Sequence, residues 1–246
     1  MKKISPPSLQ NAVRLWDATP ERVCKNCIRL YDSRISFSYQ PVNKLLLHKA
    51  RFGDSTVMLI RCVMEKEKRE WVLEYYEKIL TLYGEHIDAL NPKFAVEVQG
   101  YPLKISRELS IPVLPSMLLG LDGGSILPIP ILWSKNNLNE EQLRMLVTAV
   151  RAQMRRNPDI EDSRLQLWDF SKPSGEEDRR LRITDGDSIS VFTDTEFNQR
   201  LEVLAKGISL AQLEIDRRVE QEISRERERP NVDHGNQVSL FGDDLS

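Results

Sequence analysis

The chain lacks the features that mark exported, membrane-bound or disulfide-bonded proteins. It has three cysteines among 246 residues, an odd and low number that argues against a disulfide framework and suits a reducing cytoplasm. No segment approaches the roughly 20 uninterrupted apolar residues that span a bilayer, and no apolar stretch follows the two lysines at the N-terminus. We therefore expect a cytoplasmic protein with no membrane partner.

An excess of positive charge is also missing. The 35 Lys and Arg residues are balanced by 37 Asp and Glu residues, which gives a formal net charge of -2. Such a chain has no overall attraction for nucleic acid, so any contact with DNA must come from a local patch. Hydrophobic residues make up 40% of the chain, which is enough to build a core and excludes a disordered protein.

Familiar catalytic and cofactor-binding motifs are missing as well. Three histidines with no motif around them do not predict a Ser/His/Asp or Cys/His arrangement. Gly123 and Gly124 stand outside the Gly-Lys-Ser and Gly-x-Gly-x-x-Gly contexts of phosphate-binding loops. We expect no cofactor, and the sequence favours a noncatalytic role without excluding an enzyme.

The hydrophobic pattern predicts an α+β fold of mixed helices and short antiparallel strands. Apolar and polar residues alternate over 34–39 and 94–99, and Gly100 separates the second strand from a partner at 101–105. The segment 56–64 fits either a buried strand or the start of a helix. Asn91-Pro92 ends a helix whose apolar residues recur every four positions, namely Trp71, Tyr75, Ile79, Tyr83 and Ile87.

Four prolines interrupt the apolar segment 111–133. They remove too many amide donors for a regular central strand or a long helix. We predict a short helix over 116–121, a glycine turn at 122–124 and an extended segment that packs on the core.

Capping signals introduce the two remaining helices. Asn139 with Gln142 begins a helix that ends at Asn157-Pro158, and Thr193 with Glu196 begins a long final helix. The buried stripe of the first helix consists of Leu143, Leu146, Val147, Val150 and Met154. The stripe of the second consists of Phe197, Leu201, Leu204, Ile208, Ala211, Ile215, Val219 and Ile223. Between the two helices, apolar runs at 165–170 and 189–192 predict a hairpin.

Charges of both signs dominate the final helix beyond Ile215. This composition fits a solvated helix held by ion pairs four residues apart, or a two-stranded coiled coil in a homodimer. We divide the chain into a main α+β domain (1–192), the long charged helix (193–229) and a flexible tail (230–246).

The tail contains a short docking peptide, Gln237-Val238-Ser239-Leu240-Phe241. A polar tether with two adjacent apolar side chains has the form of a linear motif, in which a small hot spot enters a pocket. Leu240 and Phe241 are the anchor pair. Gln237 can form amide hydrogen bonds at the rim of the pocket, and Ser239 is small enough to let the backbone lie flat. The alternative is that the anchor pair folds back onto the core of its own chain.

The peptide resembles the bacterial DNA sliding-clamp-binding motif, in which glutamine, any residue, and serine or aspartate precede leucine and phenylalanine. Peptides of this kind are found near the ends of translesion polymerases, repair proteins and many mobile-element proteins. The resemblance covers five residues of 246, so it implies a partner, the clamp, and no fold.

Three basic clusters are candidates for contact with DNA phosphates. They consist of Lys44, Lys49 and Arg51, of Arg151, Arg155 and Arg156, and of Arg179, Arg180 and Arg182. Each cluster alone also fits a solvated helix end or loop. Together with the clamp-binding peptide, they predict a DNA-contacting surface.

Two weaker patterns concern metals. Cys24 and Cys27 have the spacing of half a zinc site, although buried thiols explain the pair more simply. Asp88 and the strand residues Glu97 and Gln99 faintly resemble the restriction-endonuclease core, but that core has lysine where this chain has Gln99. The solvent face of a strand is the simpler explanation for Glu97 and Gln99.

We expect a noncatalytic, DNA-contacting accessory protein of replication, repair or a mobile genetic element, recruited through the bacterial sliding clamp. The first alternative is a metal-dependent nuclease delivered by the same tail. The second is a DNA-binding transcriptional regulator that dimerises through the final helix.

Overall fold

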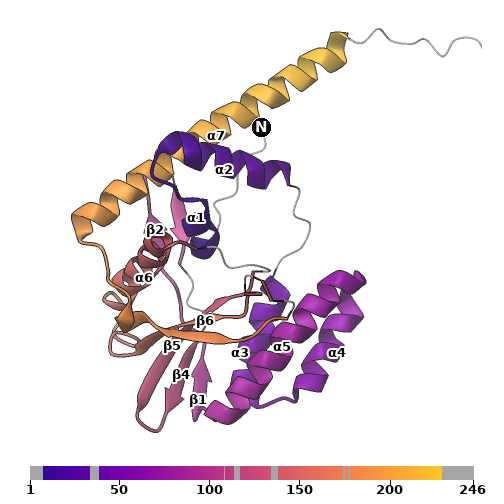
Figure 1. Ribbon diagram of the computed structural model, residues 1–246, viewed down its shortest axis with the longest axis vertical. Coiled ribbons are helices and arrows are strands. Elements are labelled where there is room, and N and C mark those ends of the chain that lie inside the picture. Colours follow the sequence, from indigo (N-terminus) through magenta and orange to yellow (C-terminus); the bar gives the residue numbers. More distant parts are fainter. Residues whose placement is uncertain are drawn as a thin grey trace, which may run out of the picture.

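The computed structural model describes residues 8–33, 39–107, 109–113, 117–133, 138–173, 175–176 and 178–228. Over these residues the chain has the α+β fold that the sequence predicts (Figure 1). The helices are α1 (Leu9–Leu15), α2 (Pro20–Asp32), α3 (Gln40–Phe52), α4 (Thr56–Lys66), α5 (Glu70–Leu90), α6 (Glu140–Met154) and α7 (Asp194–Glu228). The strands are β1 (Phe94–Val96), β2 (Pro102–Lys104), β3 (Ser110–Pro112), β4 (Leu118–Leu121), β5 (Gly124–Ile131), β6 (Arg164–Asp169) and β7 (Arg182–Asp185).

A mixed five-stranded sheet runs through the fold in the order β1-β4-β5-β6-β7. Neighbouring strands are antiparallel except for β5 and β6, which are parallel. The α6 helix lies between these two strands in sequence and makes the crossover that a parallel pair requires. β2 and β3 form a separate antiparallel pair.

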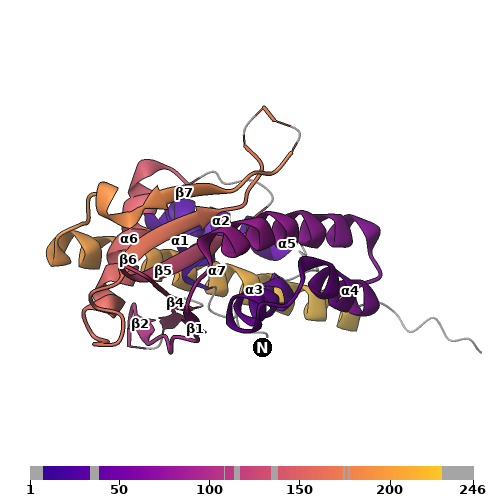
Figure 2. The same ribbon diagram turned by 90° about the horizontal axis from the view of Figure 1, so that it is seen from below.

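Two hydrophobic cores cover the two faces of the sheet. Leu165 and Leu167 of β6 pack into a core with α1, α2, α6 and α7. Trp168 and the following Phe170 pack into a second core with α3, α4 and α5. Successive strand residues point to opposite faces, so β6 supplies both cores. Figure 2 shows α3, α4 and α5 grouped together, with α3 next to β1.

β5 is a central strand although it contains Pro128 and Pro130, contrary to our prediction. The Ile131 carbonyl accepts a hydrogen bond from the Phe170 N–H (2.9 Å), so the backbone polar groups of Ile131 point towards β6. Backbone groups alternate in direction along a strand, so Ile129 and Leu127 also hydrogen-bond with β6. The two prolines face the other neighbour, β4, whose pairing with β5 extends only to Ile126. The missing N–H groups therefore interrupt neither of the ladders that the structure describes for β5.

Three local predictions are wrong, two of them because the strand pairs with a partner other than the expected one. The helix predicted at 116–121 is strand β4, and the glycine turn after it is confirmed by the pairing of β4 with β5. The segment 101–105 contributes β2, which pairs with β3 and not with β1. The hairpin after β6 closes through β7 and not through 189–192.

The segment 56–64, for which the sequence allowed a strand or a helix, lies in helix α4. Of the strand predicted at 34–39, only Tyr39 belongs to the described residues, and it immediately precedes α3. The helix predicted from the four-residue spacing is α5, which ends at Asn91 in the left-handed conformation (φ 46°).

The buried face of α5 differs from the predicted stripe. Trp71 is 47% exposed, because a strict four-residue spacing drifts around a helix of 3.6 residues per turn. The residues that face the core follow mixed steps of three and four and consist of Val72, Tyr76, Ile79, Leu80, Tyr83 and Ile87.

Both predicted capping signals are confirmed. Asn139 accepts a hydrogen bond from the Gln142 N–H (2.9 Å), and the Gln142 side chain accepts one from the Asn139 N–H (3.1 Å). Thr193 and Glu196 make the same reciprocal pair at the start of α7. The amide of Gln142 also donates to the Trp16 carbonyl (2.9 Å), so the cap of α6 anchors the end of α1.

The first part of α7 packs along α2 and belongs to the core. Its predicted stripe is buried from Phe197 to Ile215, whereas Ile223 is 44% exposed. In Figure 1 the last turns of α7 extend past the end of α2 and away from the sheet. No helix within the described ranges is long and apolar enough to cross a membrane.

Candidate functional site

The predicted clamp-binding residues Gln237, Ser239, Leu240 and Phe241 lie outside the described residues. The structure does describe the helix that leads to them. Glu214 forms ion pairs with Arg217 and Arg218 along this helix. Hydrogen bonds from both arginines lower the pKa of Glu214 to about 2. The interpretation of a helix held by ion pairs is therefore supported as far as Arg218.

Lys49, in the first basic cluster, is an interior residue and not a surface cation. Its side chain is 2% exposed, and its Nζ donates to the Asp88 carboxylate (2.8 Å) and to the Asp54 carbonyl (3.1 Å). A buried ammonium needs such partners because burial without them carries a large desolvation cost. Lys49 thus joins α3 to α5, and we remove it from the candidate DNA surface.

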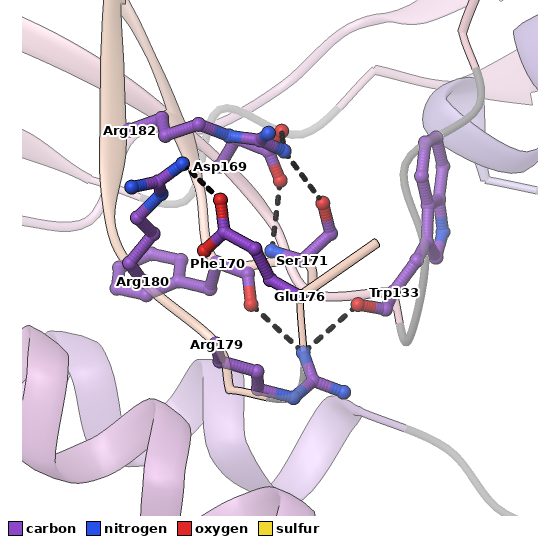
Figure 3. A network of polar contacts seen from close by, with 8 residues as sticks. All are labelled: Trp133, Asp169, Phe170, Ser171, Glu176, Arg179, Arg180 and Arg182. Carbon is purple, nitrogen blue, oxygen red and sulfur yellow. Dashed lines mark hydrogen bonds and ion pairs between the residues drawn. The ribbon is translucent and has the colours of Figure 1, made fainter. Parts of the chain in front are cut away.

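Arg179, in the third basic cluster, is also buried (Figure 3). Its side chain is 8% exposed, and Nη1 donates to the carbonyl oxygens of Trp133 (2.9 Å) and Phe170 (2.8 Å). The guanidinium lies over the ring of Tyr75 (4.8 Å to the centroid). Arg179 therefore ties the ends of two parallel strands to α5, and it too is removed from the candidate surface.

The other two arginines of this cluster have acidic partners in the same network (Figure 3). Arg182 donates to the Asp169 carboxylate (2.6 Å) and to the Ser171 hydroxyl (3.0 Å). Arg180 forms an ion pair with Glu176. Arg180 and Arg182 thus have acidic partners, whereas Arg179 donates to carbonyl oxygens, and the network closes the loop between β6 and β7.

The second basic cluster is likewise neutralised in part. Arg151 forms an ion pair with Asp187, and Arg155 lies 3.9 Å from Asp194. The partners Asp187 and Asp194 come after β7 in sequence, whereas Arg182 is the first residue of that strand. The two clusters therefore sit at opposite ends of β7 and do not form one patch.

Lys44, Arg51 and Arg156 are the predicted DNA-contacting residues that remain exposed and have no ion pair among the described residues. Lys44 and Arg51 share α3, whereas Arg156 follows α6. Three of the nine predicted DNA-contacting residues are thus exposed and without an ion pair among the described residues, and two of these three lie on α3.

The metal-binding candidates are not brought together. Cys24 and Cys27 lie on α2, and burial raises the pKa of the Cys27 thiol to about 11, as expected of an inert core thiol. Asp88 on α5 is held by Lys49 of α3, and Glu97 is an exposed residue after β1. Across the part of the chain that is described, no three His, Cys, Asp or Glu side chains form a group that could hold a metal ion.

Comparison with known proteins returned no match to a protein-family model, a curated protein or a solved structure. The candidate sites therefore rest on the residues of this chain and on their geometry.

One residue of interest on α3 was not singled out from the sequence. Phe52 is 61% exposed at the end of α3, and its ring lies 4.6 Å from the ring of His48 between centroids. The guanidinium of Arg51 lies 5.3 Å from the same centroid. The signal in the sequence was an aromatic residue after the last buried position of a basic helix, directly before Gly53.

Proposed function

We propose that this protein is an accessory factor of DNA replication, repair or a mobile genetic element that is recruited to DNA by the bacterial sliding clamp. The observation that carries the proposal is the peptide Gln237-Val238-Ser239-Leu240-Phe241. The adjacent leucine and phenylalanine supply two apolar anchors for one pocket, and the glutamine supplies an amide at its rim. Its place of action is then the bacterial cytoplasm, where clamps encircle DNA.

The course of α7 supports this proposal. The helix has 35 residues and is about 50 Å long at 1.5 Å per residue. Its first half is fixed to the core through Phe197, Leu204 and Ala211, and its last turns extend beyond the body (Figure 1). The clamp-binding peptide follows the outer end of this helix in sequence. A clamp bound there would not need to displace the core packing of α7.

The role that fits the rest of the chain best is noncatalytic. Of the acidic residues that we considered for a nuclease, Asp88 compensates the charge of buried Lys49, and Glu97 lies exposed after β1. The arginines near the ends of the parallel strands close loops and join elements. We therefore propose that recruitment and contact with DNA, rather than chemistry on DNA, are the functions of this protein.

A competition experiment tests the proposal. A synthetic peptide of residues 230–246 should bind purified clamp and displace the full-length protein. Leu240→Ala/Phe241→Ala in the peptide should weaken binding by about tenfold or more, because both anchors are lost. Val238→Ala is the matched control, since any residue fits its position in the motif. Equal competition by all three peptides would contradict the proposal.

A further inference from the structure

One face of α3 carries cations and an exposed aromatic ring. Lys44, His48 and Arg51 follow one another at helical spacings of four and three, so they share a side of the helix, and Phe52 lies beside Arg51. All four side chains are exposed. The opposite side of the helix faces the core through Val42, Leu46, Lys49 and Ala50. We call Lys44, His48, Arg51 and Phe52 the α3 platform.

The α3 platform has a net positive charge. The helix sequence contains no acidic residue, and neither Lys44 nor Arg51 forms an ion pair with a described residue. Asp54 is held 2.7 Å from His48, and Asp88 is held by buried Lys49. This distinguishes α3 from the arginine clusters near β7, where acidic partners lie within the same network.

Phe52 gives the platform a flat apolar surface. Phe52 is 61% exposed, with the His48 ring tilted against its ring (4.6 Å between centroids) and the Arg51 guanidinium 5.3 Å from its centroid. Aromatic rings held in this way, next to lysine and arginine, are the usual stacking surfaces for unpaired bases. The bases of a duplex stack on one another and do not present their faces to such a ring.

We propose that the α3 platform binds single-stranded nucleic acid. A base stacks on Phe52, while Lys44 and Arg51 contact the phosphates on either side. The two cations are seven residues apart, which is about 10 Å along the helix and spans a few nucleotides. The site is separate from the clamp-binding peptide, and it rests on the proposed function only in that clamp recruitment brings the protein to single-stranded DNA.

The test is fluorescence anisotropy of a labelled oligothymidine with the full-length protein. Phe52→Ala should weaken binding by about tenfold, as expected for the loss of one stacked base. Val57→Ala is the matched control, because Val57 is also 61% exposed and lies on the neighbouring helix α4 outside the platform. Val57→Ala should leave the affinity unchanged.

The charged residues are tested by salt dependence. In Lys44→Ala/Arg51→Ala, the slope of log K against log salt should fall by about 1.4, since each single-strand phosphate contact contributes about 0.7. Lys206→Ala, which removes an exposed lysine from α7, should keep the slope. The melting temperature of each variant shows whether the fold is retained. A purely structural role of Arg51 at the end of the helix would lower the melting temperature and leave oligonucleotide binding intact.

Any one of three results with oligonucleotides would overturn the inference. These are no binding of oligothymidine by the wild type, equal binding by Phe52→Ala, and equal affinity for a duplex with the same dependence on Phe52. A loss of clamp affinity in Phe52→Ala would overturn it as well, because the platform would then be a protein contact. Leu240→Ala/Phe241→Ala should keep oligothymidine binding, so failure of the platform and failure of the clamp proposal are separate outcomes.

Discussion

At the residue scale, two lysines of α3 have different surroundings. Lys44 and Lys49 are five positions apart on one helix, yet the first is exposed and the second is 2% exposed beside Asp88. The partner is 39 positions away in sequence, so no local pattern could have paired them. The capping residues Asn139 and Thr193 were predicted correctly because their partners are three residues away.

His86 gives a pH-dependent prediction. Its ring lies against Trp168 (4.7 Å between centroids), and Nε2 is buried with no hydrogen-bond partner among the described residues. Burial lowers the pKa of His86 below its ordinary value of about 6.5. The unfolded chain then binds the proton more tightly than the folded chain. The contribution of His86 to stability is therefore complete above about pH 6.5 and is lost as the pH falls towards the lower folded pKa.

Urea denaturation between pH 7.5 and 5 measures this effect. The wild type should lose more unfolding free energy over this range than His86→Leu, which cannot be protonated. His48→Gln is the control, since His48 lies on the surface beside Asp54. The same loss in His86→Leu as in the wild type would show that other groups cause the pH dependence.

At the element scale, the helices were more predictable than the sheet. Their signals are local, as in the capping boxes and the stripe of α6. Strand β4 was mistaken for a helix because Leu118 and Leu119 are both buried, one in each core, so the alternation of a half-buried strand is missing. The prolines of β5 misled the prediction because their tolerance depends on how far the pairing with β4 extends along β5.

The contact of α7 with α2 gives the second prediction. A Cβ on Gly207 would lie 2.4 Å from Cβ of Val23 and 2.8 Å from the Pro20 carbonyl oxygen, so Gly207→Ala must push the helices apart. We expect a loss of about 1–3 kcal/mol in unfolding free energy from overpacking, larger than the gain of up to about 1 kcal/mol in helix propensity. Thermal and urea unfolding measure this balance.

Ser209→Ala is the matched control for this variant. Ser209 is an exposed residue of α7 two positions away, and its change should alter stability by less than about 0.5 kcal/mol. Adding Val23→Ala should not recover the lost stability, because alanine keeps the Val23 Cβ that lies 2.4 Å away and removes two methyl groups from the core. A stabilised Gly207→Ala variant would contradict the close helix contact.

At the scale of the whole molecule, α7 has two parts with different roles. Its residues from Phe197 to Ala211 share a core with α6 and β6 and Ile215 is still buried, whereas Ile223 is 44% exposed. Removing residues 219–246 should therefore leave the melting temperature close to that of the full chain. Removing 193–246 should cause unfolding or aggregation, since it exposes the core beneath Phe197, Leu201 and Leu204. A stable 1–192 fragment would contradict this account of the core.

The charged end of α7 also bears on the oligomeric state. A homodimer through this end remains a prediction, because Val219 and Ile223 continue the apolar stripe beyond the core. The coiled coil predicts that the full chain sediments as a dimer and that the 219–246 deletion is a monomer, whereas the solvated helix predicts a monomer in both. A full chain that sediments as a monomer at micromolar concentration would remove the coiled coil.

The central claim is that the protein docks on the sliding clamp through its last residues. Isothermal titration of purified clamp with the intact protein, Leu240→Ala/Phe241→Ala and the control Val238→Ala tests it most directly. We predict saturable binding by the intact protein and by Val238→Ala, and a loss of about tenfold or more in the double variant. Equal affinity of the double variant and the intact protein would contradict the account.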